Sequence, residues 1–75
     1  MYAITISSED AGSTLRDVLA RVQRLDEFEQ KLGSPYSETA CMITLDDNIV
    51  PYPDLSATTV REGQSLKVFL LVCGG

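Results

Sequence analysis

The residues best suited to chemistry stand at the end of the chain, where Gly74 and Gly75 directly follow the apolar run of residues 66–73. Glycine has no Cβ, so two in a row form a thin segment that can enter a slot closed to any other residue. Gly75 also carries the α-carboxylate, which we interpret as a reactive group activated by another enzyme. The alternative is a frayed end, because small residues are common at disordered termini. The absence of a polar linker before the glycines favours the reactive interpretation.

The composition argues against catalysis by the chain itself. It contains no histidine, which excludes histidine-based zinc binding and Ser–His or Cys–His catalysis. Cys41 and Cys73 form no CxxC motif, so each is interpreted as a small apolar residue, and a disulfide between them is disfavoured in a reducing cytosol. Asp46 and Asp47 are adjacent carboxylates in a turn signal, where such residues more often solvate the turn. We therefore expect no catalytic residue, no metal site and no bound cofactor.

The length and charge restrict the class of protein. Seventy-five residues make one domain, with residues 73–75 as its flexible tail. The net charge of −5 argues against nucleic-acid binding, which needs a basic stripe, and favours a partner with a basic surface or simple solubility. No apolar run reaches the ~18 residues of a membrane span, and no basic leader precedes Tyr2. We expect a cytoplasmic protein.

The first half of the sequence predicts one strand and one helix. Residues 2–7 alternate at period two, which predicts a half-buried strand with Tyr2, Ile4 and Ile6 on one face. A helix should begin at Ser13 or Thr14, with Asp17 completing a weak capping box, and end at Gly33. One stripe of this helix is apolar: Leu15, Val18, Leu19, Val22, Leu25, Phe28 and Leu32.

The second half predicts three more strands, at 39–45, 49–50 and 66–72. Residues 46–48 form a turn between the first two, residues 51–54 are irregular, and Gly63 allows a tight turn before the last strand. Three side chains of the intervening loop are expected in the core: Leu55, Ala57 and Val60. The predicted fold is a small α+β roll, with one main helix on a mixed sheet, in which the strands at 2–7 and 39–45 pair in parallel.

The last strand has two apolar faces, although one helix can cover only one of them. We expect the core face to consist of Leu66, Val68, Leu70 and Val72, and the other face of Lys67, Phe69, Leu71 and Cys73. Phe69 and Leu71 then lie on the open face near the tail, which makes them a candidate docking surface. The alternative is that the loop at 51–60 covers them.

Three segments of the second half, at 43–51, 59–64 and 68–75, resemble the ubiquitin-like sulfur carriers of the β-grasp fold, most closely the small carrier of thiamine thiazole synthesis. The small subunit of molybdopterin synthase shares the features of the last two segments, the turn before the final strand and the Gly-Gly end. The features that carry the resemblance are Val50-Pro51 after a hairpin turn, Glu62-Gly63-Gln64 before the final strand, and Gly74-Gly75. The family usually begins with a β-hairpin, for which few residues precede the helix here, so its second strand is shortened or lost. Cys73 stands where the family commonly has alanine.

The resemblance implies a protein cosubstrate rather than an enzyme. An E1-like adenylyltransferase would use ATP to adenylate Gly75, and a persulfide protein would supply the sulfur of a thiocarboxylate. The acceptor would be thiazole synthase, with the molybdopterin synthase large subunit or the acceptor of another sulfur-transfer pathway (cysteine, methionine or specialised-metabolite synthesis) as alternatives. Gly74 and Cys73 would thread the tail into both enzymes, over a reach on the order of 10 Å from Cys73 to Gly75, while Phe69 and Leu71 dock. The Cys73 thiol could also attack the activated carboxylate.

Two further readings belong to other classes of protein. A ubiquitin-like modifier would be joined through Gly75 to lysines of target proteins, because a modifier also passes through an adenylate. An inert interaction module would have its two glycines by accident, and it would tolerate an extra residue after Gly75. Neither the residues nor their spacing decide the acceptor of the sulfur.

Overall fold

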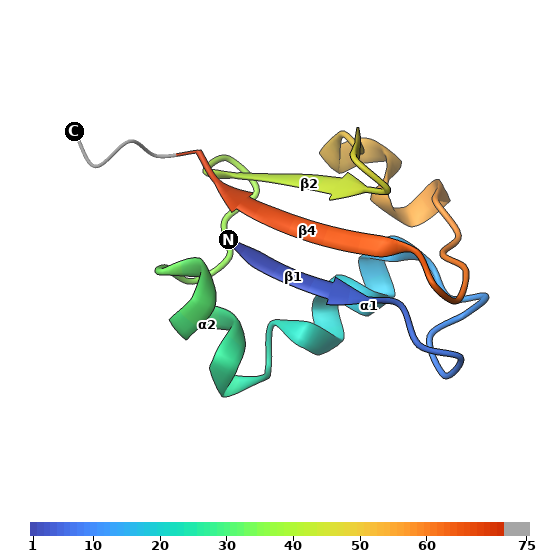
Figure 1. The fold of residues 1–75 in the computed structure, drawn as a ribbon. Coiled ribbons are helices and arrows are strands. Elements are labelled where there is room, and N and C mark those ends of the chain that lie inside the picture. The colour runs from blue at the N-terminus through green and yellow to red at the C-terminus, as the bar shows by residue number, and fades with distance from the viewer. Residues whose placement is uncertain (72–75) are drawn as a thin grey trace.

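A four-stranded sheet carries the helices on one face in the computed structural model of the chain, which describes residues 1–71 (Figure 1). In chain order the elements are β1 (Tyr2–Thr5), α1 (Leu15–Val22), α2 (Asp26–Leu32), β2 (Cys41–Leu45), β3 (Asn48–Ile49), a 3₁₀ helix η1 (Tyr52–Ala57) and β4 (Ser65–Leu70). This is the predicted α+β class with the arrangement of a β-grasp fold. No helix of the described residues is long and apolar enough to cross a membrane.

The sheet has the strand order β1-β4-β2-β3, and each neighbouring pair is antiparallel. Val68 of β4 therefore faces Tyr2 on one side and Ile43 on the other. The predicted parallel pairing of the strands at 2–7 and 39–45, and with it the mixed sheet, is wrong. These strands run in the same direction, but β4 lies between them (Figure 1).

The direction of β1 follows from the number of strands before the helix. α1 begins at the end of the sheet where β4 begins, since Leu15 N donates to Thr58 O at 2.7 Å and Thr5 pairs with Ser65. A single strand that brings the chain to this end of the sheet must run antiparallel to β4. Residues 6–14 contain turns and one bridge, Thr14 to Thr59, so of the two expected outcomes for the first hairpin, the loss of its second strand is the one seen in the described residues.

The predicted single helix is in fact two helices. Thr14 caps α1 by accepting from Asp17 N at 3.2 Å, and Gly33 ends α2 with φ 87°, both as predicted. The helix breaks at residues 23–25 because its apolar positions do not stay on one face. At about 100° per residue, an unbroken helix would place Phe28 roughly 120° from Val22. The break buries Phe28 and leaves Leu25 40% exposed.

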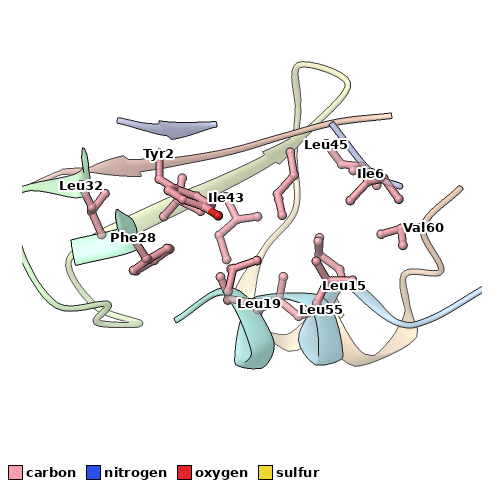
Figure 2. Close-up of a cluster of buried hydrophobic side chains, with 14 residues drawn as sticks. Tyr2, Ile6, Leu15, Leu19, Phe28, Leu32, Ile43, Leu45, Leu55 and Val60 are labelled. Carbon is pink, nitrogen blue, oxygen red and sulfur yellow. The ribbon is translucent and has the colours of Figure 1, made fainter. Parts of the chain in front are cut away.

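The core fills the space between the sheet and the helices (Figure 2). The ring of Tyr2 from β1 lies against Phe28 from α2, and Leu15 and Leu19 of α1 point toward the sheet. Residues 51–54, predicted to be irregular, belong largely to η1. Its Leu55 is buried as expected, but Ala57 is exposed, so that core assignment was wrong. With about three residues per turn, a 3₁₀ helix cannot present both positions on one side.

The two adjacent carboxylates of the β2–β3 turn have structural partners. Asp46 and Asp47 both have positive φ, at 50° and 67°, as in a tight hairpin turn. The Asp46 carboxylate accepts from Ser65 N at 2.9 Å, and the Asp47 carboxylate pairs with Lys67 Nζ at 3.1 Å. Both contacts attach the β2–β3 hairpin to β4, which agrees with the interpretation of Asp46 and Asp47 as residues that serve the turn.

Candidate functional site at the end of the last strand

The last strand ends next to the beginning of β2. β4 ends at Leu70, which pairs with Cys41, and Leu71 N then donates to Ala40 O at 2.7 Å. The ladder between the two strands therefore continues one residue beyond β4. Residues 72–75 lie outside the described residues, and with them the predicted roles of Cys73, Gly74 and Gly75.

The predicted alternation of β4 is confirmed over most of its length. Leu66 and Val68 are completely buried, whereas Lys67 and Phe69 are half-buried on the opposite face of the sheet. Leu70 departs from the pattern, with 36% exposure. β1 begins with Tyr2 opposite Val68, so no residue of β1 pairs beside Leu70.

The open face of the sheet carries both predicted docking residues. Phe69 pairs across the strands with Met42, and Leu71 is 52% exposed. η1 packs against α1, and its Leu55 enters the core, whereas Pro51 and Tyr52 at the start of the same loop line a cavity together with Leu71. The loop therefore lies beside Leu71 without burying it, and the alternative that it buries Phe69 and Leu71 is not favoured. Their docking role stays a prediction.

A small cavity of about 130 Å³ lies beside Leu71, at the side of β2 that β3 leaves uncovered. We call it the edge pocket. Its lining is mostly apolar and comes from four parts of the chain: Tyr36, Glu38, Cys41, Met42, Ile43, Ile49, Val50, Pro51, Tyr52 and Leu71. Sequence reasoning missed this pocket. The one available signal was Tyr52, an aromatic residue between two prolines.

Two tyrosines and one carboxylate set the polarity of the edge pocket. Burial, reinforced by the neighbouring Cys41 and Glu38, raises the pKa of Tyr36 to about 12. A hydrogen bond to Glu38 raises the pKa of Tyr52, whereas the positive charge of Arg16 acts to lower this pKa. Both phenols therefore remain protonated at neutral pH, and the Tyr52 hydroxyl donates to the Glu38 carboxylate.

The part of the site that the structure describes is mainly apolar. The described residues contain no group of His, Cys, Asp or Glu side chains that could hold a metal ion. Cys41 is half-buried and has no disulfide partner among the described residues. What residues 1–71 offer is an exposed apolar surface next to Leu71, the last described residue.

Comparison with known proteins identifies the family. The model of the ThiS family matches residues 4–75, nearly the whole chain. No curated protein and no solved structure gives a significant match. Members of this family are small carrier proteins rather than enzymes, and they generally work with E1-like enzymes and sulfur-acceptor enzymes. The chain belongs to the ThiS family of ubiquitin-like, β-grasp sulfur carriers.

Proposed function

We propose that this sulfur carrier transports sulfur as a thiocarboxylate on Gly75. The observation that carries the proposal is the family match, which extends through Gly74 and Gly75 to the last residue. The arrangement of the sheet supports it, because β4 brings the chain to an exposed apolar surface directly before the tail.

The chemistry requires activation, because a carboxylate is a poor acyl donor. An E1-like adenylyltransferase joins the Gly75 carboxylate to AMP and releases pyrophosphate from ATP. A persulfide of a sulfur-donor protein then attacks the acyl carbon and expels AMP, which gives an acyl disulfide. A second thiol cleaves the disulfide bond, so that Gly75 keeps one sulfur as the thiocarboxylate and the two thiols form a disulfide. The chain itself holds no cofactor in this scheme, and ATP belongs to the partner enzyme.

The residues of the chain would serve threading and docking. Gly74 and Cys73 would enter the narrow channels of both partner enzymes, because glycine presents only backbone. Phe69 and Leu71 would rest against the surface around the channel entrance. We further propose the cytoplasm as the compartment and thiazole synthase of thiamine synthesis as the acceptor, on the strength of the sequence resemblance. The large subunit of molybdopterin synthase is the alternative acceptor.

Intact-mass spectrometry tests the proposal. The protein is incubated with an E1-like adenylyltransferase, ATP and a persulfide donor, and we expect the mass gain of one oxygen replaced by sulfur at Gly75. A variant extended by one residue after Gly75 is the control and should gain nothing. An unchanged mass with no trapped adenylate would contradict the proposal. Adducts on target lysines would instead indicate a ubiquitin-like modifier.

The acceptor is identified in a second step. The thiocarboxylated chain is mixed with thiazole synthase in one reaction and with the molybdopterin synthase large subunit in another. We expect loss of the sulfur mass and formation of product only with thiazole synthase. Transfer only to the molybdopterin enzyme would contradict the thiamine assignment and leave the carrier function intact.

A further inference from the structure

The exposed apolar side chains of the described residues concentrate at the edge pocket. Ile49 is 63% exposed, Leu71 52% and Tyr52 46%, and all three line this one cavity. The remaining large exposed apolar residues are Met1, Leu25 and Leu70. An exposed apolar patch beside a cavity is typical of a site that another molecule covers.

The size of the edge pocket suits one side chain. Its volume is about 130 Å³. An apolar cavity of about 150 Å³ is large enough to bind benzene. A single branched aliphatic group or aromatic ring, such as that of leucine or phenylalanine, therefore fits the pocket, whereas a nucleotide or cofactor does not.

The edge pocket also has a defined charge. Glu38 is the one charged residue among those that line it. The three ion pairs of the described residues lie elsewhere, between Arg21 and Asp10, Lys31 and Glu27, and Lys67 and Asp47. Glu38 thus has no cation within salt-bridge distance among residues 1–71; Arg16 is near Tyr52 but does not line the pocket. A complementary partner carries a cation at this place.

We propose that the edge pocket receives a loop of the E1-like adenylyltransferase that activates Gly75, with a leucine or phenylalanine side chain in the cavity and an adjacent arginine on Glu38. The identity of this partner rests on the function proposed above. The chemistry of the loop rests only on the volume, lining and charge of the pocket.

The position of Leu71 connects this docking to the delivery of the carboxylate. Leu71 is both a wall of the edge pocket and the residue from which the tail continues. Gly75 is the fourth residue after Leu71, and at about 3.5 Å per residue these four steps span at most about 14 Å. An enzyme that binds the Gly75 carboxylate must therefore lie close to the pocket, so docking of the loop and threading of the tail occur together.

A peptide experiment tests the chemistry of the pocket without any enzyme. The ¹⁵N-labelled protein is titrated with acetyl-Arg-Leu-amide, acetyl-Glu-Leu-amide and acetyl-Arg-Gly-amide, and amide shifts are followed by NMR. We expect the Arg-Leu peptide to shift amides around Tyr36, Met42 and Ile49, and to bind about threefold more tightly than the Glu-Leu peptide, as expected for an exposed ion pair. The Arg-Gly peptide should leave these amides unshifted.

The charge-reversed variant gives the matched control for this titration. In Glu38→Arg the preference should invert in favour of the Glu-Leu peptide, whereas Glu29→Arg, at an exposed carboxylate of α2, should bind like the wild type. Equal affinities for all three peptides, shifts away from the pocket, or no shifts at millimolar peptide would overturn the proposal.

Enzyme kinetics then separate this inference from the proposed function. In the thiocarboxylation assay, Glu38→Arg and Tyr52→Ala should raise the KM for the carrier about threefold to tenfold and leave kcat unchanged. Glu29→Arg should change neither. Normal conversion with an unchanged KM in both pocket variants would refute the docking role of the pocket and leave the proposed sulfur-carrier function standing. No conversion of the wild type contradicts the proposed function, and the peptide titration then still decides the pocket.

Discussion

Tyr2 and Phe28 form an aromatic pair in the core, with ring centroids 4.7 Å apart and planes inclined by 56° (Figure 2). Tyr2 belongs to β1 and Phe28 to α2, so the pair connects the first strand to the second helix. The break between α1 and α2 is what allows this contact, because an unbroken helix would turn Phe28 away from the sheet. The pair therefore links the shape of the helical layer to the position of β1 beside β4.

Truncation of Phe28 should strongly destabilise the fold. Phe28 is 1% exposed, so Phe28→Ala removes its contact with Tyr2 and leaves a cavity. We expect a loss of about 3–5 kcal/mol in the free energy of unfolding, measured by urea denaturation. Leu25→Ala, three residues earlier at the exposed break, is the control and should change stability by about 0.5 kcal/mol or less. Similar losses in both variants would contradict the described break.

Removal of the Tyr2 hydroxyl should be harmless or beneficial. The Tyr2 oxygen is buried and has no hydrogen-bond partner among residues 1–71. A buried hydroxyl without a partner loses its hydration on folding, so Tyr2→Phe should leave stability unchanged or raise it by about 1 kcal/mol. The same denaturation experiment measures this. A clear destabilisation would show that the hydroxyl has a hydrogen bond.

Tyr36 should make the folded protein sensitive to alkaline pH. Burial raises its pKa from 10.0 to about 12, so between these values the folded state binds more protons at Tyr36 than the unfolded state. Its contribution to stability is therefore complete below pH 10 and declines as pH rises towards 12. We expect denaturation curves of the wild type to lose stability more steeply across this range than those of Tyr36→Phe. Parallel pH profiles for the two proteins would contradict this expectation.

The elements with a strong local signal were predictable from the sequence. The cap at Thr14, the left-handed glycines Gly33 and Gly63, and the turn at Asp46 and Asp47 all appear as expected. Each of these depends on a few neighbouring residues, whose backbone preferences act without help from the rest of the fold. Pattern reading is reliable for such features.

The errors concern features that tertiary contacts decide. The helix break depends partly on the contact of Phe28 with Tyr2, which lies outside the helix; its other signal, the displacement of Phe28 by roughly 120° from Val22, is contained in the spacing. The position of β4 between β1 and β2 depends on pairing between distant segments. The edge pocket escaped prediction for the same reason, since Tyr36, Ile49 and Leu71 meet only in the folded chain. Local sequence signals carry no information about such contacts between distant segments.

The two carboxylates of the β2–β3 turn should contribute unequally to stability. Asp46 accepts hydrogen bonds from Ser65 N at 2.9 Å and Gln64 Nε2 at 3.3 Å, whereas Asp47 makes one exposed ion pair with Lys67. Asp46→Ala should cost about 1–3 kcal/mol, and Asp47→Ala about 0–1 kcal/mol from its ion pair. Both positions have positive φ, so the strain that alanine adds is similar in the two variants. Urea denaturation measures the difference, and equal losses would contradict the anchoring role of Asp46.

The proposed division between docking and threading predicts different kinetic effects for Phe69 and Gly74. Phe69→Ala trims the open face beside the tail, so it should raise the KM for the carrier about tenfold with little change in kcat. Gly74→Val adds a side chain where the channel must be narrow, and the misplaced carboxylate should lower kcat about 100-fold. Thr5→Ala, on the same open face but at the far end of β4, is the control. Thiocarboxylation followed by intact mass gives both constants, and a loss of kcat in Phe69→Ala, or an unaffected Gly74→Val, would show that the two residues do not have these roles.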